Sequence, residues 1–174
     1  MVITNVKIVT LDKVIENGYV IISGDKILSV NEGHYQGEDK DIIDGGNKIL
    51  MPGFIDVHIH GSAGIDFMDA SEEDYKIIST SLFKEGVTGY LATTLTSDLD
   101  SLIKVAKNVK KAIKDNPSLI GIHLEGPYIN AKYKGAQNEL YIRKPDILEF
   151  DKLNEASGNN IRYISLAPEV EGSL

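Results

Sequence analysis

The chain has 174 residues, with 18 Lys and Arg against 26 Asp and Glu, a net charge of -8, and no cysteine. At about 150 residues per domain, this length predicts one domain or one domain with a small addition. Without cysteine there is no disulfide scaffold, no thiol catalysis and no Cys-ligated metal site, so any metal must be held by His and carboxylate side chains. The acidic balance argues against nucleic acid or an anionic membrane as a partner, although a local basic patch can coexist with it.

The first residues lack the basic region and apolar stretch of a secretion signal. No apolar run approaches the roughly 18 residues of a membrane span. The hydrophobic fraction of 42% and the charged fraction of 25% are ordinary for a globular protein. We therefore expect a cytoplasmic protein that does not bind membranes.

The N-terminal part is predicted to be β structure. Residues 2–31 contain short β-branched segments separated by the turn signals Asn17-Gly18 and Gly24-Asp25, which predicts three strands. Between residues 32 and 47 the composition shifts to Gly, Asp, Glu and Lys. We therefore expect a boundary there, with an N-terminal β segment over residues 1–48 and a second part over residues 49–174.

The second part alternates between strand-like and helix-like segments. The helices are expected at residues 71–84, with Ser71 as the cap, and at 99–114 and 146–157, and the strands at 49–60, 87–94, 119–124 and 161–167. Strict alternation predicts a parallel sheet with right-handed crossovers. The sequence stops after the fourth strand without a further helix, which is typical either of a small open sheet or of the first half of a larger fold.

The densest chemical signal is the run PGFIDVHIHG at residues 52–61. Side chains alternate along a strand, so Asp56, His58 and His60 share one face. Two imidazoles on one face, at the C-terminal end of a buried strand, can converge on one cation. Metal binding is therefore favoured over the alternative that each histidine is simply a hydrogen-bonded core or surface residue. His34, in the polar linker, is expected to be only solvated.

A second signal is the run IHLEGP at residues 122–127, where His123 and Glu125 share a face. An ionised glutamate at a buried strand end is costly unless it is paired or bound to a metal. Taken alone, Glu125 would be expected to pair with Lys132 or Lys134. Together with the two histidines, metal ligation is favoured, because active sites of parallel α/β folds gather at strand C-termini.

These motifs carry a family resemblance over nearly the whole chain. The N-terminal β segment and the run ILMPGFIDVHIHG resemble the opening of the amidohydrolase superfamily, which are metal-dependent (β/α)8 barrels with a small β domain. The segments TTLTS, HLEGPYIN, KGAQ and LAPE resemble the N-acetylglucosamine-6-phosphate deacetylase family within it. The resemblance implies an α/β fold: the first half of a (β/α)8 TIM-type barrel preceded by strands of a small β-sandwich domain.

The resemblance also implies roles for individual residues. Glu125 matches the family's main metal-binding carboxylate, and His58 and His60 match a pair that holds a second metal in some members. One or two divalent ions are implied, with Zn, Fe, Mn and Co all open. Gln137 matches a position that carries His in some members and lies near the sugar, so Gln137 and its neighbour Ala136 are expected to bind substrate. His123 is expected to be a hydrogen-bonded barrel histidine.

The implied activity is metal-dependent deacetylation of an amino-sugar phosphate, N-acetylglucosamine 6-phosphate, to glucosamine 6-phosphate and acetate. In that family two further histidine ligands and an aspartate that acts as general base and acid come from later strands. We expect those groups beyond Leu174, so no catalytic residue is expected in this chain, and the isolated chain is predicted to be inactive. The resemblance implies a homodimer for the full-length protein.

Two alternatives stay open from the residues. One is another amidohydrolase, a cyclic amidase of the dihydroorotase or hydantoinase type, although such enzymes usually bridge their metals with a carboxylated lysine from a later strand. The other is a non-catalytic half-barrel that associates with a complementary half, since open sheet edges invite pairing.

Overall fold

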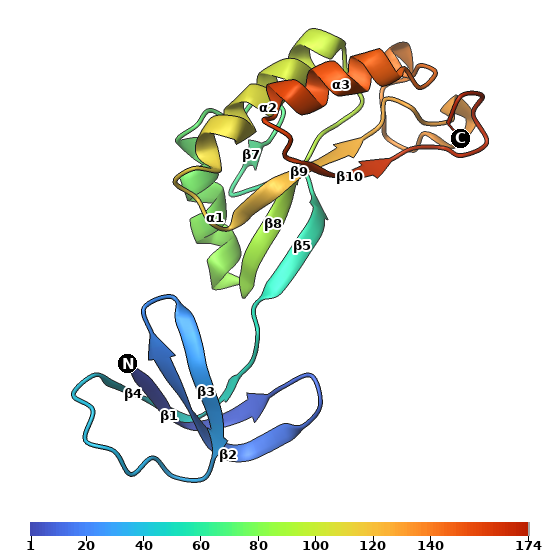
Figure 1. Cartoon of the computed structure of the whole chain (residues 1–174). Coiled ribbons are helices and arrows are strands. Elements are labelled where there is room, and N and C mark those ends of the chain that lie inside the picture. The colour runs from blue at the N-terminus through green and yellow to red at the C-terminus, as the bar shows by residue number, and fades with distance from the viewer. Residues whose placement is uncertain (174) are drawn as a thin grey trace. The chain divides into compact units, whose positions relative to one another are not determined.

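The structure is a computed structural model that describes residues 1–173. The chain divides into two compact units, Met1–Pro52 and Gly53–Leu174 (Figure 1). The division falls at Pro52 because the last strand of the first unit continues to Leu50. None of the helices in the described part is long and apolar enough to cross a bilayer.

The first unit is a four-stranded sheet in the order β3-β2-β1-β4, formed by β1 (Val2–Val9), β2 (Val14–Ser23), β3 (Lys26–Glu32) and β4 (Ile42–Leu50). The three strands predicted for residues 2–31 are confirmed. A further strand, not expected from the polar composition of residues 32–47, begins there: β4 starts at Ile42 and pairs parallel with β1. Most of its side chains are exposed, so it lacks the apolar alternation by which a strand is recognised.

The second unit is a parallel sheet in the order β10-β9-β8-β5, built from β5 (Phe54–Ile59), β8 (Val87–Thr93), β9 (Leu119–Glu125) and β10 (Ile161–Ser165). Its helices lie on one face of the sheet (Figure 1): α1 (Asp74–Lys84), α2 (Leu99–Ala112) and α3 (Ile147–Ala156). The predicted alternation is confirmed. Of the strand expected at residues 49–60 and entered through Pro52-Gly53, residues 54–59 form β5, whereas residues 49 and 50 belong to β4. Pro52, which has no N–H for a ladder, separates the end of β4 from the start of β5.

A short hairpin that the pattern did not predict follows β5. It pairs β6 (Gly61–Ser62) with β7 (Ile65–Asp66), and the Phe67 N–H donates to the His60 carbonyl at 2.9 Å. A side chain at Gly61 would meet the Ile65 carbonyl oxygen at 1.9 Å, so only glycine allows this close return. The hairpin thereby determines the direction in which the chain leaves His60.

The core of the second unit lies between the sheet and its helices. Phe67 stacks on Tyr75 and on Tyr90, with ring centroids 5.7 and 5.8 Å apart. The buried side chains of α2 complete this layer: Leu102, Val105, Ala106, Val109 and Ala112. These side chains fill the space between the sheet and the helices that cover one of its faces.

Two further short elements lie in the loop between β9 and α3, the 3-10 turns η1 (Ala131–Tyr133) and η2 (Glu139–Tyr141). Helix α1 begins at Asp74, and the prediction that Ser71 caps it is wrong. The Ser71 N–H and hydroxyl instead donate to the Asp74 carboxylate, each at 2.8 Å.

Helix α2 has a side-chain cap. The Asp98 carboxylate accepts from the Ser101 N–H at 2.9 Å and from the Ser101 hydroxyl at 2.8 Å. The backbone hydrogen bond from Ser101, together with that hydroxyl, lowers the pKa of Asp98 below its usual 3.8.

We predict that Asp98→Ala lowers the melting temperature, whereas Asp98→Asn, which keeps an acceptor oxygen, lowers it less. Because the folded-state pKa of Asp98 is lowered, its contribution is present above pH 3.8 and is lost as the pH falls through the folded-state value. Thermal unfolding is followed by circular dichroism at neutral pH and near pH 2. The difference in melting temperature between wild type and Asp98→Ala should be smaller in acid. A difference that stayed constant would contradict this role.

Candidate metal centre

The two polar motifs meet at one oxygen atom. The Nε2 atoms of His58 and His60 lie 3.2 and 3.1 Å from Glu125 Oε2. One ligand atom from each residue lies within 4.8 Å of the others. His58 belongs to β5, His60 follows it directly, and Glu125 ends β9, so the three side chains come together across the intervening strand β8.

The chemistry of this cluster fits a divalent cation. Ligand atoms about 2.0–2.1 Å from a tetrahedral ion lie about 3.3 Å from one another, close to the two distances here. His60 Nδ1 is buried and has no hydrogen-bond partner among residues 1–173, and the other ring nitrogen, Nε2, faces Glu125 Oε2. Imidazole nitrogen with carboxylate oxygen is a donor set that Zn, Fe, Mn and Co accept.

The lysines that could have paired with Glu125 are engaged elsewhere. Lys134 Nζ donates to the Gln137 carbonyl at 3.3 Å, and Lys132 Nζ lies 5.3 Å from the centroid of the Tyr133 ring. The recorded ion pairs of Glu125 within the described residues are those with the two histidines. Its carboxylate, 21% exposed, therefore has imidazole partners rather than an ammonium group.

Asp56 does not join the cluster, although it was expected on the same face. The β5–β8 ladder has a register shift between Asp56 and Ile59, where the strand carries the histidine motif. Asp56 Oδ1 accepts from the His58 N–H at 3.0 Å, within this irregular stretch. The Asp56 carboxylate thus accepts a backbone hydrogen bond beside the two histidines and lies outside the cluster.

His123 is fully buried, and both of its ring nitrogens are engaged. Nδ1 lies 2.9 Å from the Val57 carbonyl oxygen and Nε2 lies 2.8 Å from Ser165 Oγ. A carbonyl oxygen can only accept, so Nδ1 carries the hydrogen and Nε2 of the neutral ring accepts from the hydroxyl. Burial lowers the pKa of His123 below 6.5, against the opposing effect of the Val57 hydrogen bond. The expectation of a hydrogen-bonded barrel histidine agrees with this geometry.

The segment that carries Ala136 and Gln137 is tied to the loop after β8. Gln137 is 7% exposed, and its Oε1 accepts from the Thr96 N–H at 2.7 Å. Ala136 beside it is exposed. Gly126, directly after β9, also approaches this loop. Its φ is 70°, and a side chain at this position would clash with Thr96 Oγ1. The KGAQ and TTLTS motifs therefore meet in space.

Sequence reasoning missed Arg143, which anchors the same loop. Its Nε donates to the two oxygens of Glu149 at 2.9 and 3.0 Å, and its Nη1 donates to the carbonyls of Ser97 and Tyr141 at 2.9 and 2.8 Å. The Tyr128 hydroxyl donates to the same carboxylate at 2.9 Å. A single arginine six residues before a helical glutamate is too weak a signal to have predicted this arrangement.

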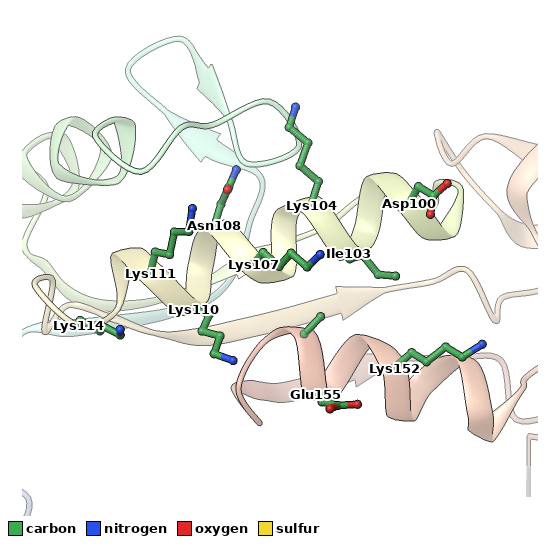
Figure 2. A pocket seen from close by; sticks show the side chains of 11 residues that line it. Asp100, Ile103, Lys104, Lys107, Asn108, Lys110, Lys111, Lys114, Lys152 and Glu155 are labelled. Atoms are coloured by element: carbon green, nitrogen blue, oxygen red, sulfur yellow. The ribbon is translucent and has the colours of Figure 1, made fainter.

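A wide hollow of the surface lies elsewhere, between α2 and α3 (Figure 2). It encloses about 920 Å³ and is lined mainly by lysines: Lys104, Lys107, Lys110, Lys111, Lys114 and Lys152. Within residues 1–173 none of these lysines forms an ion pair. A basic patch does coexist with the net charge of -8, but none of the metal-site residues lines it.

Comparison with known proteins identifies the class. Residues 49–172 match the amidohydrolase family, and the chain belongs to it. It is 39% identical to the N-acetylglucosamine-6-phosphate deacetylase of Bacillus subtilis strain 168 over an alignment of 176 residues. The aligned region covers 97% of this chain and 44% of the relative. The chain thus spans less than half the length of that relative.

Solved structures agree. The N-acetyl-D-glucosamine-6-phosphate deacetylase of Mycobacterium smegmatis superposes with a TM-score of 0.90 at 25% identity, over 99% of this chain and 45% of that one. A mutant of it in complex with N-acetyl-D-glucosamine-6-phosphate gives 0.89 at 26% identity, over 99% and 45%. The expected fold, the first part of an amidohydrolase barrel, is confirmed, and these relatives lend no support to the cyclic amidase alternative.

We predict that Arg143→Gln loosens the loop between β9 and α3. Hydrogen bonds to a charged group contribute about 1.5–3 kcal/mol each, so losing them should raise the open population of the loop at least about tenfold. Trypsin should then cut after Lys132 and Lys134 faster by a similar factor, as followed by mass spectrometry. Arg162→Gln is the matched control, because Arg162 is exposed and has no ion pair among the described residues. Equal cleavage rates in the two variants would contradict the prediction.

Proposed function

We propose that this chain is the metal-binding N-terminal part of an N-acetylglucosamine-6-phosphate deacetylase. The observation that carries the proposal is the convergence of His58, His60 and Glu125 at the strand ends of an amidohydrolase sheet. The likeness to deacetylases over nearly the whole chain supports the reaction, hydrolysis of the acetamide to acetate and glucosamine 6-phosphate.

In this proposal Glu125 supplies the negative charge of the site, and the two Nε2 atoms supply neutral donors. These three side chains would hold a divalent cation of the Zn, Fe, Mn or Co type, which would serve there as a Lewis acid for a carbonyl oxygen and for water. The hydrogen bond from the His58 N–H to the Asp56 carboxylate and the hairpin after His60 hold the histidines in place for it. The chain therefore acts by binding and orienting the cation rather than by moving protons.

Gln137 is proposed to meet the sugar, with Ala136 beside it. Because its carbonyl oxygen already accepts from the Thr96 N–H, the amide NH₂ is the end that is free to contact a substrate. It would donate to an acceptor oxygen of the sugar phosphate. The two further histidine ligands, the aspartate that acts as base and acid, the homodimer and the cytoplasmic location belong to the proposal as implications of the resemblance.

We predict that the isolated chain binds Zn²⁺ and that Glu125→Gln or His58→Ala weakens binding more than about 100-fold. This exceeds the 10- to 100-fold loss typical of residues that only support a ligand. Equilibrium dialysis with metal analysis measures it. His34→Ala is the matched control, because His34 lies in the first unit and contacts Asn17 rather than the cluster. Unchanged affinity in Glu125→Gln would refute the site.

The reaction itself is tested with a chimera. Residues 1–173 of this chain, joined to the remaining C-terminal part of the Bacillus subtilis relative, should release acetate from N-acetylglucosamine 6-phosphate. The isolated chain should not, because the expected acid and base are absent from it. The Glu125→Gln chimera should lose the activity, since it lacks the charge that holds the cation. A folded, metal-loaded chimera without turnover would overturn the proposed reaction, and turnover by the isolated chain would overturn the division of roles.

A further inference from the structure

The histidine motif lies where the backbone ladder of its strand is interrupted. β5 is an edge strand of the described sheet, with β8 as its neighbour, and their pairing is irregular between Asp56 and Ile59. Backbone groups in such a gap need other partners. Three side chains provide them: Asp56 accepts from the His58 N–H, Thr93 Oγ1 accepts from the Ile59 N–H at 3.0 Å, and His123 donates to the Val57 carbonyl.

We infer that His123 is a positioning residue for the metal site, holding the peptide before His58 so that both histidines of β5 face Glu125. The inference rests on the proposed metal site and adds a residue to it. His123 and Glu125 lie two residues apart on β9, so they share a face of the strand. One strand therefore supplies both the carboxylate and the group that fixes the facing histidines.

His123 is itself held rigidly enough for this task. It is fully buried, and Ser165 of β10 engages the ring nitrogen opposite the one that bonds Val57. Its ring also makes T-shaped contacts with the rings of His58 and Tyr163, at centroid distances of 4.7 and 4.6 Å. Because the ring is hydrogen-bonded on both sides, it holds the backbone of β5 at a fixed position relative to β9 and β10, across β8.

The hydrogen-bond pattern dictates which variants are informative. His123→Phe keeps a ring of similar shape but removes the donor to Val57 and the acceptor for Ser165. His123→Gln offers an N–H donor and a carbonyl acceptor and should restore part of the function. Ser165→Ala removes only the hydroxyl that is hydrogen-bonded to His123 Nε2. The matched control is Ser79→Ala, whose hydroxyl is buried and bonded to Tyr75, Tyr90 and Asn116 in the core away from the cluster.

The experiment measures Zn²⁺ affinity of the chain by equilibrium dialysis and the visible spectrum of its Co²⁺ form, with melting temperatures recorded for every variant. We expect His123→Phe to weaken Zn²⁺ binding 10- to 100-fold and to change the Co²⁺ spectrum. His123→Gln should recover much of the affinity, and Ser165→Ala should lie between wild type and His123→Phe. Ser79→Ala should lower the melting temperature while leaving affinity and spectrum unchanged.

The outcomes separate this inference from the proposed function. Metal binding by wild type with unchanged affinity in His123→Phe overturns the inference and leaves the metal site standing. If Ser79→Ala weakens binding as much as His123→Phe, general stability explains the effect and the inference is wrong. If His123→Phe does not fold, wild-type affinity together with an unchanged Co²⁺ spectrum in Ser165→Ala overturns it. A wild-type chain that binds no Zn²⁺ or Co²⁺ overturns the metal site and this inference together.

Discussion

The site depends on a single carboxylate oxygen, Glu125 Oε2, which two imidazoles reach from a strand that is not its neighbour. Neighbouring strands lie about 4.8 Å apart, so β5 and β9 are separated by about 10 Å with β8 between them. The side chains must therefore lean together over β8. A carboxylate that is largely removed from water needs compensation from hydrogen-bond donors or from a positive charge. A divalent cation bound between the three side chains would supply that charge.

Local periodicity was enough to predict which residues would approach one another. In a strand the direction of a side chain follows from its parity, so His58 and His60 had to share a face, and Glu125 had to lie at the same edge of a parallel sheet. The same parity placed Asp56 with them, yet its carboxylate turns to the His58 N–H. The interruption of the ladder arises from the pairing of β5 with β8, which the sequence of one strand does not contain.

The elements that escaped prediction share a physical cause. β4 is stabilised by pairing with β1 about 40 residues earlier, and its exposed side chains carry no apolar pattern. The hairpin after His60 depends on the close approach of Gly61 to Ile65, and Arg143 depends on partners from three separate segments. In each case the stabilising contact is between residues distant in sequence or in a turn, where hydrophobic periodicity gives no signal.

The described residues bring together His58, His60 and Glu125, a group suited to hold a cation, and the chain spans less than half the length of the Bacillus subtilis relative. Proton transfer is expected from residues outside it. In the proposed function, metal affinity and turnover are therefore separate properties, because the first would depend on His58, His60, Glu125 and the hydrogen bonds around them. That group lies wholly within the second compact unit, so its cation affinity can be measured on this chain without the residues proposed to transfer protons.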